Sequence, residues 1–171
     1  MDPLLTARLV IRELTPADAA FTLELLNEPG FHRYIGDRGI RDVAGAEKYL
    51  NDGPIASYAR HGHGLWMVEL KESREPVGIC GLLKRDTLPH PDLGFAFLAR
   101  HCGQGYGFES ASAGLNYGRS VLRLPTILAI TALENPASIK LLGKLGFRFE
   151  RTVTLAGIAA PNRLFVFDRP A

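Results

Sequence analysis

The most informative stretch of the sequence is FAFLARHCGQGYGFESA, from Phe95 to Ala111, where a strand pattern passes through a glycine-rich turn directly into a helix pattern. Gly103, Gly105 and Gly107 let the backbone approach a ligand closely. The free N–H groups and the dipole at the start of the following helix favour a bound anion. The stretch therefore predicts a phosphate site, and a diphosphate would fit it well.

The spacing of this turn differs from that of the common nucleotide-binding loops. No Gly-Lys-Ser/Thr follows the glycines, as a P-loop requires. No acidic residue ends a next strand about 20 residues further on, as a dinucleotide fold requires. A Rossmann unit also conflicts with the antiparallel strands expected before the turn.

The residues before the turn predict a strand, two helices and an antiparallel meander. Thr6 to Leu14 alternates as a strand does, and Thr15-Pro16-Ala17-Asp18 then starts a helix that runs to about Leu26. After an irregular stretch that begins at Asn27-Glu28-Pro29-Gly30, a short helix is expected from Asp42 to Leu50. Three strands follow, at Leu65 to Leu70, Val77 to Leu83 and Asp92 to Leu98.

The residues after the turn alternate between helices and strands. A helix from Gly105 to Leu122 would bury a stripe formed by Phe108, Ala111, Leu115 and Leu122. The later elements are a strand from Thr126 to Ala132, a helix from Asn135 to Gly146, and strands near Phe147 to Thr154 and Arg163 to Phe167. This order predicts one domain over residues 1–171, a mixed sheet with helices on its faces. The last strand is either a dimer edge or an internal pair.

Composition excludes several classes of protein. The chain has 171 residues, 46% of them hydrophobic and 22% charged, which is typical of one globular domain. A net charge of +2 argues against a nucleic-acid partner. Cys80 and Cys102 lack metal or disulfide spacing and are read as free thiols. With no leader-like or membrane-length apolar run, we expect no membrane partner and a cytoplasmic location.

Arg100-His101-Cys102-Gly103-Gln104-Gly105 resembles the Gln/Arg-x-x-Gly-x-Gly/Ala signature with which GNAT acetyltransferases hold the pyrophosphate of coenzyme A. Further segments occur in the family's order, and together they look like the branch that includes the ribosomal-protein N-terminal (Rim-type) acetyltransferases, over about Thr6 to Phe167. These segments are Gly64-Leu65-Trp66, Pro76-Val77-Gly78, Asp92-Leu93-Gly94-Phe95, Asn135-x-x-Ser138 and Lys144-Leu145-Gly146-Phe147.

The resemblance implies a GNAT fold of the α/β (α+β mixed) class. Its central mixed, mostly antiparallel sheet would have about seven strands with splayed middle strands, and four helices on its faces. It implies acetyl-CoA as co-substrate and no metal, with the pantetheine paired to the strand end and the pyrophosphate on the glycine turn. Cys102 departs from the family, which commonly has Arg, Lys or Trp there. The residues implied to bind coenzyme A are Phe97, Leu98, Ala99, Cys102, Gly103, Gln104, Gly105, Tyr106, Gly107 and Asn135.

Amide formation from a thioester requires a neutral amine, a polarised carbonyl and a way to protonate the leaving thiolate. The resemblance implies that Asp92 is the base, that Asn135 contacts the pantetheine and that Ser138 lies near the sulfur. The alternatives are a solvated strand-end carboxylate for Asp92, a helix cap for Asn135 and a solvent-facing serine for Ser138. His90 and His101 flank the site and are alternative bases.

Two further features bear on the ligands. His61 and His63 lack a third ligand nearby, so the sequence predicts no metal site. The resemblance implies that two segments contact the acceptor, residues Asn27 to Tyr58 and residues Leu155 to Asn162. It also implies direct attack by a primary amine in a ternary complex. The resemblance implies a peptide N-terminal α-amine as the leading acceptor, and no acidic cluster that would favour a polycation is evident in this region. An aminoglycoside, a polyamine, a longer acyl-CoA, a non-catalytic sensor and a monomer or homodimer all remain open.

Overall fold

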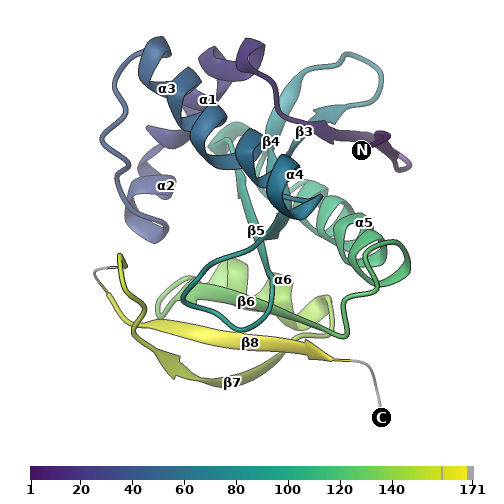
Figure 1. The fold of residues 1–171 in the computed structure, drawn as a ribbon, viewed down its shortest axis with the longest axis vertical. Coiled ribbons are helices and arrows are strands. Elements are labelled where there is room, and N and C mark those ends of the chain that lie inside the picture. The colour runs from purple at the N-terminus through teal and green to yellow at the C-terminus, as the bar shows by residue number, and fades with distance from the viewer. Residues whose placement is uncertain (159, 169–171) are drawn as a thin grey trace.

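The computed structural model describes residues 1–158 and 160–168. One sheet runs through it in the order β1-β2-β3-β4-β5-β6-β8-β7, with helices packed on both faces (Figure 1). The strands are β1 (Leu4–Leu5), β2 (Leu9–Glu13), β3 (Leu65–Leu70), β4 (Pro76–Leu83), β5 (Asp92–Phe97), β6 (Thr126–Ala132), β7 (Arg148–Val153) and β8 (Asn162–Asp168). The α-helices are α1 (Ala19–Leu26), α2 (Pro29–Tyr34), α3 (Val43–Leu50), α4 (Ala56–His61), α5 (Tyr106–Ser120) and α6 (Pro136–Lys144).

The fold class and the meander are confirmed, and the element counts need correction. The described residues form eight strands where about seven were expected, because the two-residue β1 adds to the edge of β2. They form six α-helices where four were expected, because α2 and α4 had not been foreseen. The last strand, β8, lies between β6 and β7 and is therefore an internal pair.

Both additional helices involve proline. Pro29 was expected to stop α1, but it also lies in the first turn of α2, where the missing N–H costs nothing. After α3 the chain stays helical through a π-helical segment, Asn51–Ile55, which carries Pro54 and leads into α4. The wider hydrogen-bonded turn accommodates a residue that cannot donate. Helix α4 then ends at Gly62, whose φ of 72° is left-handed.

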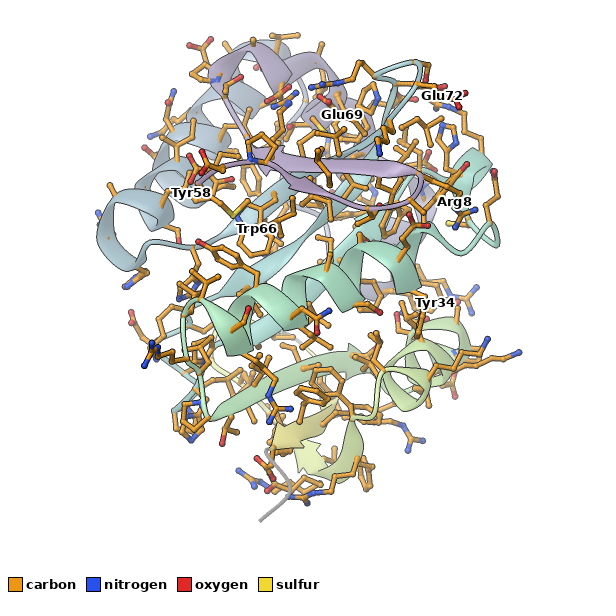
Figure 2. The ribbon with its side chains drawn as sticks, turned by 90° about the vertical axis from the view of Figure 1, so that its right-hand side faces the viewer. Arg8, Tyr34, Tyr58, Trp66, Glu69 and Glu72 are labelled. Carbon is orange, nitrogen blue, oxygen red and sulfur yellow. The ribbon has the colours of Figure 1, made fainter. Side chains whose placement is uncertain are left out.

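The two faces of the sheet carry separate hydrophobic clusters, because neighbouring residues of a strand point to opposite sides. In β3, Met67 packs with Leu25 of α1 and Leu50 of α3. On the other face, Trp66 packs with Leu115 of α5, and Figure 2 shows Trp66 beside that helix.

The middle of the sheet opens into a gap. Strand β5 lies antiparallel to β4 along its whole length. Its pairing with β6 is parallel and, in the described residues, consists of Asp92 opposite Leu128, with Leu128 N–H donating to the Pro91 carbonyl at 2.9 Å. Beyond this point the two strands diverge toward their carboxyl ends. The predicted splay of the middle strands is therefore present.

Helices α5 and α6 begin at the open end of this gap. Helix α5 follows β5 through the glycine turn, and α6 follows β6 directly. In open sheets that contain parallel strands, ligands bind at the carboxyl ends of the strands, where such helix starts meet. Among the described residues no helix has the length and apolar character needed to cross a bilayer.

Candidate active site

The glycine turn joins the end of β5 to α5 through a short 3-10 segment, Ala99–His101. Gly103 has a φ of +76° and Gly105 a φ of +85°, values that strain any residue with a Cβ. Gly107 is needed for space instead, because a Cβ there would lie 3.3 Å from Leu141 Cδ2 and 3.5 Å from Phe97 Cε2. The three glycines therefore serve two different purposes.

The turn presents backbone donors to solvent. Residues 102–105 are exposed, and Gly105 is the N-cap of α5. The first N–H groups of a helix have no partner within the helix and, with the helix dipole, attract anions. No acidic side chain occurs between Cys102 and Gly107 to oppose an anion. The arrangement fits a pyrophosphate, as the sequence predicts.

A contact between distant parts of the chain holds the turn in place. Glu109 Oε1 accepts hydrogen bonds from Thr6 Oγ1 at 2.6 Å and from Arg8 N–H at 2.8 Å, and Oε2 accepts one from Arg8 Nε at 2.7 Å. Arg8 Nη1 also donates to the Gln104 carbonyl at 3.0 Å. Although burial raises it, these donors hold the pKa of Glu109 below its usual value. Sequence reasoning missed Arg8, since no local pattern links it to residues about 100 positions away.

The residues just before the turn are committed to other partners. Arg100 Nη1 donates to Glu24 Oε1 of α1 at 2.5 Å, and His101 Nε2 lies 3.0 Å from Glu75 Oε1. Burial raises the pKa of the Cys102 thiol, and Glu28 adds to the effect. Cys102 and Cys80 are both free, as predicted.

The end of β5 presents backbone groups to the gap. In the antiparallel ladder with β4, Leu98 N–H donates to the Val77 carbonyl at 3.0 Å, and hydrogen-bonded residues alternate from there. Phe97 therefore turns its backbone away from β4, toward the gap. Ala99 N–H donates to Glu28 Oε1 at 3.3 Å. Of the three residues expected to pair with pantetheine, Phe97 is the one whose backbone donor has no such partner in the described residues.

Asp92 lies at the closed end of the gap and is fully buried. Arg85 Nε donates to both of its carboxylate oxygens, at 2.9 and 3.1 Å. This excludes the alternative of a solvated strand-end carboxylate. Burial raises the pKa of the Asp92 carboxyl, while the attraction of Arg85 opposes that rise.

Asn135 and Ser138 form the start of α6. Asn135 Oδ1 accepts a hydrogen bond from Ser138 N–H at 3.1 Å, which is the expected N-cap interaction. Ser138 is half-buried in the first turn of this helix. One turn further on, Leu142 is buried and apolar, so this position has no group that could protonate the leaving thiolate. The contacts of Asn135 and Ser138 with coenzyme A stay predictions.

The remaining histidines do not form a metal site. His63 is buried, and its Nδ1 lies 2.7 Å from the Leu82 carbonyl. Burial lowers the pKa of His63, which keeps the ring neutral at pH 7. Across residues 1–158 and 160–168 no three potential ligands among His, Cys, Asp and Glu gather to hold a metal ion.

Comparison with known proteins identifies the family. The model of the Acetyltransferase (GNAT) domain matches residues 8–148. The uncharacterised N-acetyltransferase p20 of Bacillus licheniformis is 29% identical over 154 residues, which cover 88% of this chain and 84% of p20. The crystal structure of an acetyltransferase from Agrobacterium tumefaciens has a TM-score of 0.84 at 23% identity, over 99% of this chain and 95% of that chain.

Two structures with named acceptors share the fold. RimL, a ribosomal L7/L12 alpha-N-protein acetyltransferase in complex with coenzyme A, has a TM-score of 0.83 at 13% identity, over 96% of both chains. A variant of the spermidine N-acetyltransferase SpeG from Vibrio cholerae has a TM-score of 0.72 at 18% identity, over 95% of both chains. Because the family model covers most of its length, the chain belongs to the GNAT acetyltransferases, which take their acetyl group from acetyl-CoA.

Proposed function

We propose that the protein transfers an acetyl group from acetyl-CoA to a primary amine by direct attack in a ternary complex, and that the acceptor is a protein or peptide N-terminal α-amine. The observation that carries this proposal is the buried carboxylate of Asp92 at the closed end of the gap between β5 and β6. It is a strong hydrogen-bond acceptor, held by Arg85, at the point where the two strands begin to diverge.

Asp92 is the proposed base. Acetyl-CoA supplies an acyl group whose bond to sulfur breaks as the bond to the amine nitrogen forms. The attacking amine must lose a proton, and Asp92 accepts it directly or through one water. Burial raises the pKa of Asp92 toward the operating pH, which increases its basicity, while Arg85 keeps the group ionised before reaction.

The start of α6 provides the other two groups. Asn135 contacts the pantetheine arm through its side-chain amide, whose oxygen already caps the helix. Ser138 donates a hydrogen bond to the departing sulfur and stabilises the charge that develops there. On the other side, backbone groups of Phe97 and of the glycine turn hold the pantetheine and the pyrophosphate.

Three of the four acidic side chains between α2 and α4, all but Glu47, have partners within this segment, which favours a peptide amine over a polyamine as the acceptor. Asp37 pairs with Arg41 at 2.5 Å, and Asp52 pairs with Lys48 at 2.5 Å. Asp42 caps α3 by accepting from Gly45 N–H at 2.7 Å. A polycation needs several available carboxylates, and this segment holds these three in contacts of its own. The likeness to RimL agrees with this acceptor, while the likeness to SpeG keeps a polyamine as the second candidate.

The test is acetyl transfer measured by mass spectrometry on one mixed panel of acceptors. The panel holds peptides with free Ser or Ala N-termini, Lys peptides with blocked N-termini, aminoglycosides and polyamines. We expect acetylation of the free N-terminal peptides. Acetylation of spermidine alone would assign the small-amine function, and binding of acetyl-CoA without any transfer would assign a sensor.

The role of Asp92 has its own test. Asp92→Asn should lower kcat by about 10²- to 10⁴-fold, the usual contribution of a general base, with little change in the Kd for acetyl-CoA. His101→Gln and His90→Gln are the matched variants of the alternative bases. If either histidine variant abolishes the pH dependence of kcat/KM while Asp92→Asn preserves it, the base is that histidine.

A further inference from the structure

A pocket of about 270 Å³ lies between the helical run from α3 to α4 and the start of β3. This run packs on one face of the sheet (Figure 1). Whole small-molecule sites begin at about 300 Å³, so the pocket fits a group the size of a side chain. The residues that matter for its chemistry are Tyr49, Asp52, Arg60, His61, Leu83 and Lys84.

The pocket lies on the face of the sheet toward which Asp92 points. Leu83 of β4 is directly opposite Asp92 of β5, and residues directly opposite each other in an antiparallel pair point to the same face. Leu83 lines the pocket, and its side chain lies across Gly94, where a Cβ would be 2.6 Å from Leu83 Cδ1. Asp92 and the pocket are therefore neighbours on one face.

This spacing matches one residue of a peptide. The Cα atoms of opposite residues in an antiparallel pair are about 4.5–5.5 Å apart, and consecutive Cα atoms of a chain are about 3.8 Å apart. An acceptor peptide whose terminal amine reaches Asp92 therefore has its second residue within reach of Leu83 and of the pocket beside it.

Tyr49 of α3 connects the pocket to the ion pair of Asp92. Its ring lines the pocket. Burial raises the pKa of the Tyr49 hydroxyl, while the charges of Arg38 and Arg85 oppose that rise. Arg85 is the residue that holds both carboxylate oxygens of Asp92. The pocket wall therefore lies within the electrostatic range of the proposed base and its partner.

Positive charge predominates in the pocket. Arg60, at the end of α4, and Lys84, just after β4, are both exposed there, and His61 adds an imidazole. The acidic side chain of the lining, Asp52, is paired with Lys48 at 2.5 Å. Across residues 1–158 and 160–168 Arg60 takes part in no ion pair, so its guanidinium can bind an anion without breaking another contact.

Lys84 is held in place by the loop that follows β4. Its Nζ donates to the Arg85 carbonyl at 3.2 Å and to the Leu88 carbonyl at 3.0 Å. An ammonium group has three donors, so one is left for a ligand. The two cations of the pocket thus come from different segments, α4 and the loop after β4.

We propose that this pocket binds the carboxylate of an acidic side chain in the acceptor peptide, at the residue that follows the acetylated N-terminal amine. Arg60 and Lys84 are the residues that bind it, and they make the enzyme selective for acidic N-termini. The proposal rests on the proposed function, because it concerns a peptide acceptor. It adds the charge of the second residue, on which the role of Asp92 does not depend.

The first test compares three peptides that begin Ser-Glu, Ser-Gln and Ser-Lys and are otherwise identical, at saturating acetyl-CoA. The kcat/KM for Ser-Glu should exceed that for Ser-Gln by about five- to tenfold, as a partly exposed charge-assisted contact provides, and Ser-Lys should be the poorest acceptor. Equal values for the three peptides overturn the role of the pocket and leave the proposed function standing. Transfer to none of them overturns both.

The second test assigns the preference to Arg60. Arg60→Gln should remove most of it, Arg60→Lys should restore it, and Arg60→Glu should reverse it in favour of Ser-Lys. Arg33→Gln is the matched control, since Arg33 is an exposed arginine of α2 outside the pocket and should keep the preference. If Arg60→Glu leaves the order of the peptides unchanged, the assignment to Arg60 is wrong.

The third readout separates binding from a structural effect. A contact made equally before and during reaction changes KM and leaves kcat alone. Arg60→Gln should therefore raise the KM for Ser-Glu, with kcat and both constants for Ser-Gln unchanged. Melting temperatures check that each variant is folded. An equal loss of kcat/KM for Ser-Glu and Ser-Gln would show that Arg60 acts through the fold and would overturn the proposal.

Discussion

Among single residues, Gly105 is important because its left-handed backbone forms the start of α5, where the pyrophosphate is proposed to bind. Its φ of +85° is a left-handed conformation at the N-cap of α5, and the missing Cβ makes room for Arg8. Any side chain at position 105 would be strained by the positive φ and would also crowd Arg8.

Gly105→Ala should therefore raise the Kd for acetyl-CoA by at least about tenfold, while the strain of about 1–2 kcal/mol lowers the melting temperature by only a few degrees. Gly39→Ala is the matched control, because Gly39 also has a positive φ, +71°, with open space around it. Calorimetry with acetyl-CoA and thermal unfolding of both variants provide the check. A loss of affinity in Gly39→Ala equal to that in Gly105→Ala would contradict a local effect.

Arg85 and Asp92 form a buried ion pair, with exposed side-chain fractions of 30% and 1%. Removing one member of such a pair leaves the other without compensation. Arg85→Met alone should cost about 3 kcal/mol or more in the free energy of unfolding, whereas Arg85→Met with Asp92→Asn should cost less than Arg85→Met alone. Urea unfolding of the single and double variants measures the coupling. Additive losses would show that the two side chains act independently.

At the scale of elements, β4 is held against β3 by an approach that only glycine permits. A Cβ on Gly81 would lie 2.1 Å from the Gly64 carbonyl oxygen and 2.8 Å from Leu65 Cα. Both are backbone atoms at the start of β3, so they cannot turn aside as a flexible side chain would.

Gly81→Ala should destabilise the protein by about 3 kcal/mol, at the upper end of overpacking costs. Gly143→Ala should have the opposite sign and stabilise by about 0.5–1 kcal/mol, because Gly143 lies within α6 with nothing near its Cβ position. Free energies of unfolding in urea give both values. A neutral Gly81→Ala variant would mean that β3 and β4 shift apart without cost.

At the scale of the whole molecule, the sheet buries Cys80 of β4 under α5, and this links global stability to pH. Burial raises the pKa of the Cys80 thiol to about 12, from 9.0 in the unfolded chain. Between these values the unfolded chain releases the thiol proton and the folded protein keeps it. The unfolded state then binds fewer protons, so stability falls as pH rises above 9.

Between pH 8 and pH 10 the free energy of unfolding should fall by about 1.4 kcal/mol, because pH 10 lies about one unit above the pKa of the Cys80 thiol in the unfolded chain. Cys80→Ala should be less stable than the unmodified protein at pH 8, since it leaves a small cavity, but should lose less stability between pH 8 and 10. Urea unfolding at both pH values tests the difference between the two slopes. Parallel slopes would show that Cys80 does not carry the effect.

Elements with local sequence signals could be predicted before the structure was known. Strand-like apolar runs bounded by turn residues predicted β3, β4 and β5, and Asn135-Pro136 predicted the capped start of α6. Glycine spacing located the turn before α5. Helix α2 was missed because Pro29 was read as part of a stop, whereas it lies in the first turn of that helix. No element was predicted between Leu50 and Leu65, where Pro54 lies in a π-helical turn that leads into α4.

The contacts between residues far apart in the sequence became visible in the packed structure alone. It brought Arg8 to Glu109 across 101 positions, enclosed Asp92 with Arg85, and left Phe108 exposed on a helix face that periodicity predicted to be buried. Spacing along a chain reports which residues share a face of one element. Burial and pairing depend on how several elements pack, and that depends on contacts between segments that no local pattern connects.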